Sequence, residues 1–333
     1  MSRHKPPEDL ESLAAVVQRL GVLLAAEVAP ASGWGHVALA ARGQAAVGAG
    51  WVADVAARGG SVAEAIAAVA GSPGPGRTPS RARFSSMSGS PDRGRPGTDG
   101  SAWRGLAAAW LVASDAGAPL APTLARFADT LRSLAQNQRD IDTALAGPIA
   151  TARMVMVLPV IGILFGMALG FDSIRVLFTT PPGLLCLAFG IALMLLAQVW
   201  NRRLLRGARP TNLTPGLALD LMAIGVSGGA SLPRAERAVA NARQRCGIDS
   251  DGSDAAITEV LELSRRAGIP AAALLRAEAI EARRAAKSAG ERTAATLAVT
   301  LMLPLGLCVL PAFMVLGVAP LLIAVISSTV TGL

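Results

Sequence analysis

Residues 183–200 read GLLCLAFGIALMLLAQVW, a stretch of eighteen residues without a charged side chain. A helix of that length crosses about 30 Å of hydrocarbon. The stretch ends at a strongly basic border formed by Arg202, Arg203, Arg206 and Arg209. It therefore predicts a membrane-spanning helix over residues 182–201, and with it a membrane protein rather than a soluble globule.

Two more apolar stretches extend this prediction along the chain. Residues 154–171 read MVMVLPVIGILFGMALGF and predict a span over residues 153–172. The last 41 residues, from Thr293 to Leu333, carry no charge, and as one helix they would extend about 60 Å. We expect a span over residues 294–318 followed by an apolar tail over residues 319–333. A hairpin that turns near Pro320 and adds a partial fourth span is the alternative.

The composition and the placement of charge indicate the topology. Of the 333 residues, 52% are hydrophobic and 16% are charged, whereas soluble proteins average about 25% charged. Residues 1–153 hold 15 of the 31 Lys and Arg, residues 202–292 hold another 15, and Arg175 alone lies between the first two spans. The positive-inside rule places both basic segments in the cytoplasm. We predict a multi-pass protein of the cell (inner or plasma) membrane with a cytoplasmic N-terminus. The net charge of +8 is then explained by the basic residues on the cytoplasmic side of the membrane, and we expect no nucleic-acid partner.

The basic segments carry apolar residues at helical spacing, which is typical of packing faces in helical bundles. One stripe is Leu10, Leu13, Val17, Leu20, Leu24 and Val28; another is Leu120, Leu124, Phe127, Leu131, Leu134, Ile141 and Leu145. We predict an all-α membrane protein with about three transmembrane helices and two cytoplasmic helical-bundle domains. The first bundle covers residues 1–70 and 101–152, and the second covers residues 212–292. Gly, Pro, Ser and Arg supply 23 of the 30 residues in 71–100, so we expect a disordered linker there.

The two halves of the chain resemble each other. The tetrapeptide AGAP (116–119) precedes one periodic helix, AGIP (267–270) precedes another, and each helix leads toward a span with an early Leu-Pro pair. A looser match pairs LGV (20–22) with IGV (224–226). Helix, glycine, short gap, proline and second helix is typical of a helical hairpin. The sequence therefore predicts an internal repeat.

Two local features refine these expectations. The apolar run 213–233 contains Asp220, and a carboxylate at the centre of a bilayer costs about 2.5–3.5 kcal/mol. We therefore expect a soluble amphipathic helix that ends near the glycines at 225–229. Pro159, Pro304 and Pro311 lie inside the predicted spans, where a missing N–H group favours a kink.

The sequence contains no motif that predicts a catalytic, cofactor-binding or metal-binding residue. A Walker-type phosphate loop needs a lysine after its glycines, and neither Lys5 nor Lys287 has that context. The only histidines, His4 and His36, do not form a zinc-binding pair. The sequence GVSG (225–228) matches the surroundings of an intramembrane protease serine, but such a serine needs a histidine in the membrane. The cysteines at 186, 246 and 308 show neither metal spacing nor a disulfide framework, and we expect them to be small buried residues.

Four blocks of the sequence resemble the type II secretion system F superfamily. They are AGAPLAPTLARFADTLR (116–132), LAGPIATARMVMVLPVIGILFGMALG (145–170), TPPGLLCLAFGIALMLLAQVWNRRL (180–204) and LPLGLCVLPAFMVLGVAP (303–320). Proteins of this superfamily form the inner-membrane platform of type II secretion and of type IV pili. The order helical domain, two spans, helical domain, terminal span is similar to the actinobacterial branch linked to tight-adherence (Flp-type) pilus assembly.

The resemblance implies a non-catalytic platform. Its partners would be a hexameric secretion or pilus ATPase, a second platform subunit or further copies of itself, pilin and the lipid bilayer, and it would need no cofactor. The alternative is a small polytopic membrane transporter with cytoplasmic helical domains. Such a transporter needs polar residues along its pathway, and the spans offer only Gln198, Thr296 and Thr300. A divergent copy that has lost pilus function is a third reading.

Overall fold

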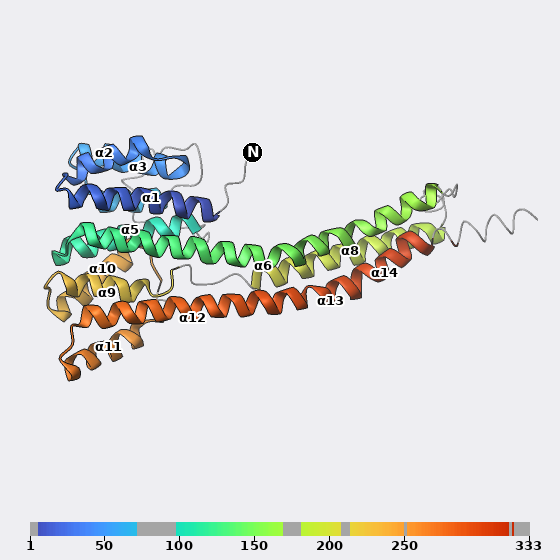
Figure 1. The fold of residues 1–333 in the computed structure, drawn as a ribbon. Coiled ribbons are helices and arrows are strands. Elements are labelled where there is room, and N and C mark those ends of the chain that lie inside the picture. The colour runs from blue at the N-terminus through green and yellow to red at the C-terminus, as the bar shows by residue number, and fades with distance from the viewer. Residues whose placement is uncertain are drawn as a thin grey trace, which may run out of the picture. The chain divides into compact units, whose positions relative to one another are not determined.

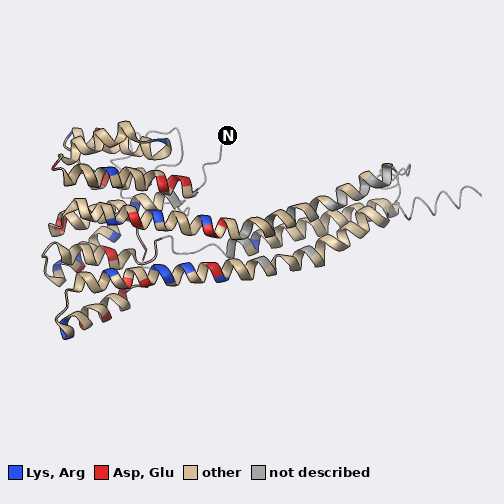
Figure 2. Cartoon of the chain, in the orientation of Figure 1, with Lys and Arg blue, Asp and Glu red and all other residues tan. Residues whose placement is uncertain are grey.

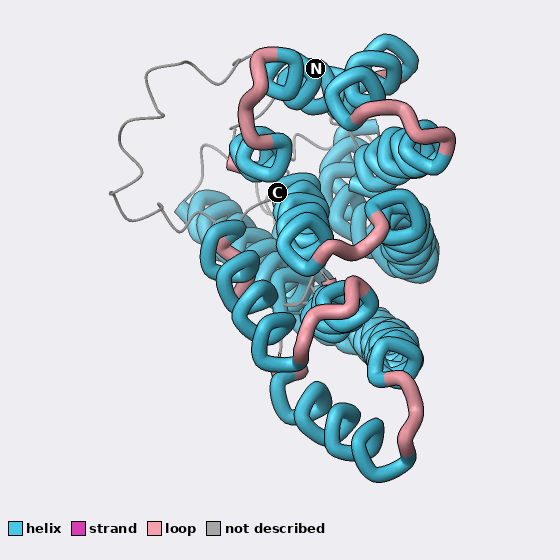
Figure 3. Tube along the Cα trace, turned by 90° about the vertical axis from the view of Figure 1, so that its left-hand side faces the viewer, coloured by secondary structure: helices cyan, strands magenta, loops and turns pink. Residues whose placement is uncertain are grey.

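A computed structural model of the chain describes residues 6–71, 98–168, 181–207, 214–249, 252–319 and residue 322. Figure 3 shows that these residues form helices joined by turns and loops, without a strand among them. The expectation of an all-helical fold is confirmed. The helices belong to two compact units, of which the first comprises Met1–Arg139 and Thr211–Lys287 and the second comprises Asp140–Pro210 and Ser288–Leu333.

The first unit contains helices from both ends of the chain (Figure 1). Two long helices begin in this unit and continue into the second, α6 (Leu120–Ala168) and α12 (Ala271–Thr300). The helices that lie wholly within the first unit are α1 (Pro6–Ala25), α2 (Pro30–Ala40), α3 (Gly43–Ala57), α4 (Val62–Ala70), α5 (Thr98–Ala116), α9 (Leu217–Ser227), α10 (Leu232–Cys246) and α11 (Asp254–Ala267).

Helix α5 lies at the centre of the first unit. Its side chains are buried on nearly all sides from Ala102 to Ala113, and Leu106 and Val112 have no exposed surface. A helix that is apolar all round has to be covered by other elements. Helices α1 and α4 cover α5 from the N-terminal part of the chain, and α9 and α10 cover it from the part after residue 211.

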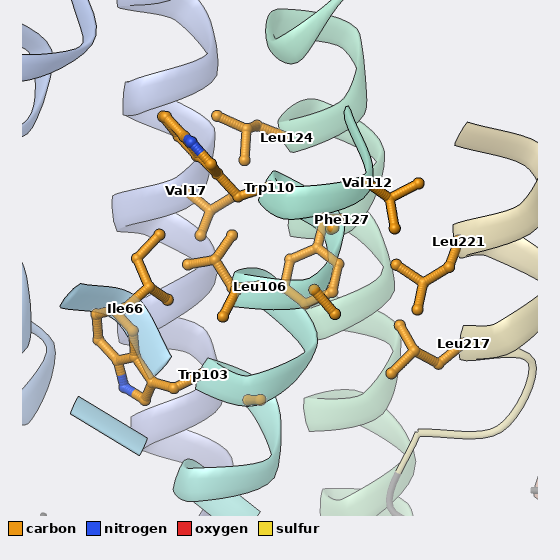
Figure 4. Packing of buried hydrophobic residues seen from close by; sticks show 14 of the residues in the cluster. Val17, Ile66, Trp103, Leu106, Trp110, Val112, Leu124, Phe127, Leu217 and Leu221 are labelled. Carbon is orange, nitrogen blue, oxygen red and sulfur yellow. The ribbon is translucent and has the colours of Figure 1, made fainter. Parts of the chain in front are cut away.

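The two segments expected to form separate bundles therefore share one hydrophobic core. Figure 4 shows residues of this core from both segments around α5. They come from α1, α4, α5, α6 and α9: Val17, Ile66, Trp103, Leu106, Trp110, Val112, Leu124, Phe127, Leu217 and Leu221. Ion pairing adds a polar connection at the surface, because Arg245 of α10 donates to Glu64 of α4 at 2.6 Å.

Helix boundaries in the first unit follow the local sequence. At the start of α4, the Ser61 hydroxyl accepts a hydrogen bond from the backbone N–H of Glu64, which is one half of the capping-box arrangement S-x-x-E. At the AGAP and AGIP corners, Gly117 and Gly268 have φ of 69° and 66°. A residue without Cβ reaches this left-handed region at little cost. The shared corner supports the internal repeat, which stays a prediction.

The looser pairing of LGV (20–22) with IGV (224–226) does not mark helix ends. Gly21 lies inside α1, and a Cβ there would lie 3.3 Å from the backbone oxygen of Ala121 in α6. Gly225 lies inside α9, and a Cβ there would lie 3.0 Å from that of Ala235 in α10. Both glycines allow a close approach between helices, and α1 instead ends near Glu27, a non-glycine residue with φ of 61°.

The predicted apolar stripes face the core where the structure describes them. Leu13, Val17 and Leu20 of α1 and Leu124 and Leu131 of α6 are at most 2% exposed. The helix expected within the run 213–233 is also confirmed, since α9 ends at Ser227 before Gly228 and Gly229. It is less amphipathic than expected, because most of its residues are buried in the shared core: Leu217, Ala218, Leu219, Leu221, Met222, Ala223 and Gly225.

The second unit combines α8 (Pro181–Gly207) with the later parts of α6 and α12. A run of short helical segments continues from α12: α13 (Met302–Pro304), η2 (Leu305–Val309), α14 (Leu310–Phe313) and η3 (Met314–Val318). Ala197 of α8 is buried together with Cys308 and Val309, and Trp200 packs against them. Figure 2 shows few charged positions along the described part of this unit.

Two helical stretches are long and apolar enough to cross a membrane, Gly183–Asn201 and Ala271–Val318. They contain the predicted spans 182–201 and 294–318 almost entirely. Their outer faces are apolar, with Leu185 of α8 73% exposed and Leu307 of η2 67% exposed. Surface of this kind suits lipid better than water.

Parts of four predicted segments lie outside the described residues. Helix α6 follows the predicted span 153–172 as far as Ala168, and its residues Met154 and Leu164 are 79% and 58% exposed. Most of the linker 71–100, the Arg175 region and most of the tail 319–333 are not described. Helix α5 begins at Thr98, three residues before the predicted boundary at 101.

The prolines of the last span are followed by π-helical turns. Pro304 directly precedes η2, and Pro311 lies in α14 just before η3. Proline removes a backbone N–H group, and a local change from α-helical to π-helical hydrogen bonding is a known response inside a helix. The structure thus shows a changed hydrogen-bond pattern beside two of the three prolines where the sequence predicts kinks, whereas α6 continues as an α-helix through Pro159.

We expect Gly190 to be essential for the packing of the second unit. A Cβ at this position of α8 would overlap the side chain of Leu316 in η3, and overpacking of this kind costs about 1–3 kcal/mol. Gly190→Ala should therefore lower the thermal unfolding midpoint of the purified protein in detergent. Gly306→Ala is the matched control, since a Cβ there meets nothing within 4 Å. Leu316→Ala should lower the midpoint less in the Gly190→Ala background than in the wild type, because it relieves the overlap there. Equal effects of the two glycine substitutions would contradict this account.

Candidate functional site

The GVSG motif has a structural explanation. The Ser227 hydroxyl donates to the carbonyl oxygen of Ile224 at 2.9 Å, a bond within the last turn of α9. Gly228 packs directly against the backbone of Ala116, so that a Cβ would overlap the Ala116 carbonyl oxygen. The glycine is needed for this contact between the ends of α9 and α5. The motif therefore contributes to packing, and its serine hydroxyl is engaged with the helix backbone.

The cysteines behave mostly as small apolar residues. Cys246 and Cys308 are 5% and 2% exposed, as expected from the sequence, while Cys186 is half-buried. Burial raises the pKa of the Cys246 thiol to about 11, against the opposing effect of Arg245 and Arg104. A thiol with a raised pKa is a poor nucleophile. In the part of the chain that the structure describes, no cluster of His, Cys, Asp and Glu is suited to a metal ion.

A groove of about 590 Å³ in the first unit is the strongest candidate site. Helices α6, α9 and α12 line it, so it brings together residues that are far apart in the chain. Its lining contains five basic and two acidic side chains along with apolar and hydroxyl-bearing ones: Thr123, Arg126, Phe127, Asp129, Thr130, Ser133, Asn137, Asp220, Ile224, Arg276, Ile280, Arg283, Arg284 and Lys287. We call this feature the basic groove.

An ion pair connects α9 with α12 in the basic groove. Arg283 Nη1 lies 2.6 Å from Asp220 Oδ2, and the two side chains are 17% and 25% exposed. Desolvation by burial raises the pKa of the Asp220 carboxyl above its ordinary value, although the positive charges of Arg283, Arg276 and Arg126 oppose the shift. The pairing explains why an aspartate is tolerated in an otherwise apolar core helix.

The cations of the basic groove affect one another. Burial lowers the pKa of Arg276, the charge of Arg126 lowers it further, and the charge of Asp220 acts in the opposite direction. Arg284 is paired with Glu281 at 2.6 Å, and Arg283 is paired with Asp220. The groove therefore keeps a net positive charge that its own carboxylates do not neutralise.

No sequence pattern predicts this groove. In the sequence, Arg126 and Arg276 count only among the basic residues of segments 1–153 and 202–292, which orient the chain. The proximity of α6 to α12 arises from tertiary packing around α9, which no local pattern encodes. Asp220 was the one available signal, because an acidic residue in an apolar helix needs a partner.

These observations define a class: an all-helical protein with two helical stretches long and apolar enough to cross a membrane, and with a helical unit built from two separate segments of the chain. Residues 17–168 match the family model of type II secretion system (T2SS), protein F. The match extends from within α1 to the last described residue of α6. The match supports the type II secretion system F superfamily for this part of the chain. No curated protein and no solved structure matches the chain.

The raised pKa of Asp220 predicts a pH dependence of stability. Between the ordinary pKa of aspartate and the higher pKa in the folded protein, the folded state binds more protons than the unfolded state. The contribution of Asp220 to stability therefore falls as the pH rises through this window. We expect the difference in thermal unfolding midpoint between the wild type and Asp220→Asn to decrease from about pH 3 to pH 7, measured on the full chain in detergent.

Asp129→Asn serves as the control for this measurement, because it removes the same charge from a side chain that is 72% exposed. A pH profile of Asp220→Asn that stays parallel to the wild type throughout this range would contradict the role assigned to burial.

Proposed function

We propose that the chain is a non-catalytic platform subunit of a type II secretion or type IV pilus assembly machine in the inner (plasma) membrane. The match of residues 17–168 to the type II secretion system F family carries this proposal. The four sequence blocks similar to the actinobacterial branch further suggest a tight-adherence (Flp-type) pilus. In this role, the protein couples a cytoplasmic secretion ATPase to the extraction and assembly of pilin.

The architecture of the chain supports a platform role. Helices α6 and α12 each begin in the first unit and continue into the second, which carries the apolar helical stretches. Each of these two helices therefore contributes residues to both units. We propose that a force applied by a partner on the first unit reaches the membrane through them.

The proposed topology has the first unit in the cytoplasm and the link between the first two spans outside. It rests on the two groups of 15 basic residues that flank these spans. In this arrangement the first unit lies on the side of the membrane where ATP is available. The partners are a hexameric ATPase, pilin, and a second platform subunit or further copies of this chain.

We expect cysteine labelling to confirm this topology. Ser173→Cys, in the link between the first two spans, should react with a membrane-impermeant maleimide in intact cells. Ser72→Cys, in the linker, should react only after the membrane is permeabilised. Both variants would be made in a background where Cys186, Cys246 and Cys308 are replaced by alanine. Labelling of both positions in intact cells would overturn the assignment of the N-terminus to the cytoplasm.

Photo-crosslinking in native membranes tests the proposed partners. A photoreactive residue at exposed apolar positions of the first unit, Val22, Leu39, Val47 or Leu263, should capture a secretion ATPase or a platform subunit from at least one position. The same residue at Leu185, which is exposed on the predicted span of α8, is the control and should not capture the ATPase. Recovery of neither an ATPase nor a platform subunit from any of the first-unit positions would refute the platform proposal.

A further inference from the structure

The basic groove of the first unit has two cations without an acidic partner. Arg126 of α6 and Arg276 of α12 both line it, and neither forms an ion pair with any described residue. The other arginines of the lining differ, because Asp220 engages Arg283 and Glu281 engages Arg284. Two guanidinium groups from different helices are thus available to a ligand.

The charges of these two arginines are unfavourable to each other. Arg276 is half-buried, and both its burial and the charge of Arg126 act against its ionised form. An anion between the two groups would replace repulsion with attraction. A guanidinium offers a planar fork of N–H donors that fits phosphate or carboxylate oxygens in pairs.

The lining of the basic groove also has an apolar part. Phe127, Ile224 and Ile280 supply an apolar wall, and Ile280 is 44% exposed. Ser133 and Asn137 of α6 add polar groups along the same side. A ligand that fits this lining combines an anionic group with a flat or apolar part.

The size of the groove favours a small molecule over a protein segment. Sites for small ligands usually have volumes of about 300–1,000 Å³, and this groove has about 590 Å³. A helical peptide would need a longer apolar face with anchors over several turns. The apolar part of the lining consists of only the three side chains named above.

We propose that the basic groove binds a small phosphate-bearing ligand of the nucleotide or lipid-headgroup class. Arg126 and Arg276 hold the phosphate from opposite helices, and the apolar part of the ligand lies against Phe127 and Ile280. The ligand joins α6 to α12, the two helices that continue into the second unit. This site is independent of the platform role, since it rests on the lining of the groove alone.

Calorimetric titration of the full chain in a neutral detergent tests the proposal with pyrophosphate and ADP as soluble probes. Binding of either probe should weaken about tenfold or more in Arg126→Gln and in Arg276→Gln, because each loses charged hydrogen bonds. Arg276→Lys keeps the charge without the fork and should bind more weakly than the wild type but better than Arg276→Gln. Arg266→Gln is the matched control, since Arg266 lies on α11 and is paired with Glu262.

A competition arm distinguishes the two sources of phosphate. Short-chain phosphatidylglycerol is added to the protein with the soluble probe bound. If the lipid displaces the probe, the ligand is a lipid headgroup; if the probe stays bound, the ligand is a soluble phosphate compound. The proposal is overturned by lack of binding of pyrophosphate, ADP and phosphatidylglycerol, or by binding that the Arg126 and Arg276 variants leave unchanged. It is also overturned if an acidic peptide binds in the groove while none of the phosphate probes does. Circular dichroism of each variant verifies that the helices are retained.

Discussion

The burial of helix α5 is the constraint on which the first unit depends. From Ala102 to Ala113 this helix has almost no surface left for water, so it can exist as a folded helix only while other helices surround it. The covering helices come from before the linker and from after the second span. The two parts of the chain that form the first unit are therefore one folding unit, although residues 140–210 separate them in the sequence.

This arrangement explains which parts of the fold could be predicted. Leu13, Val17 and Leu20 repeat at helical spacing, so their burial follows from the sequence, as do the helical corners at Gly117 and Gly268. The two helical stretches that are long and apolar enough to cross a membrane follow from apolar length and low charge. The sequence does not predict that helices from both parts of the chain pack around α5. Apolar residues on all sides of a helix show that other elements cover it, but they do not show which elements these are.

The basic groove illustrates the same limit at the level of a site. Arg126 and Arg276 are 150 residues apart, and each resembles an ordinary exposed cation on its own helix. Their charges matter together only because α6 and α12 both pack beside α9. Under the positive-inside rule these arginines help to orient the chain in the membrane. In the folded unit, the same side chains give the groove the positive charge that would attract an anionic ligand. Asp220 connects the two readings, since its pairing with Arg283 holds α12 against the core helix.

The π-helical turns beside Pro304 and Pro311 have a geometric consequence for the last span. Leu301, Cys308, Ala312 and Leu316 are all buried within the second unit. In a straight α-helix, residues as far apart as Leu301 and Leu316 would drift by about 60° around the axis. Each π-helical turn accommodates more residues than an α-helical turn, so η2, which lies between these two residues, acts against this angular drift. The prolines thereby keep one side of the helix in register with α8 over its length, and the opposite side remains free to face lipid.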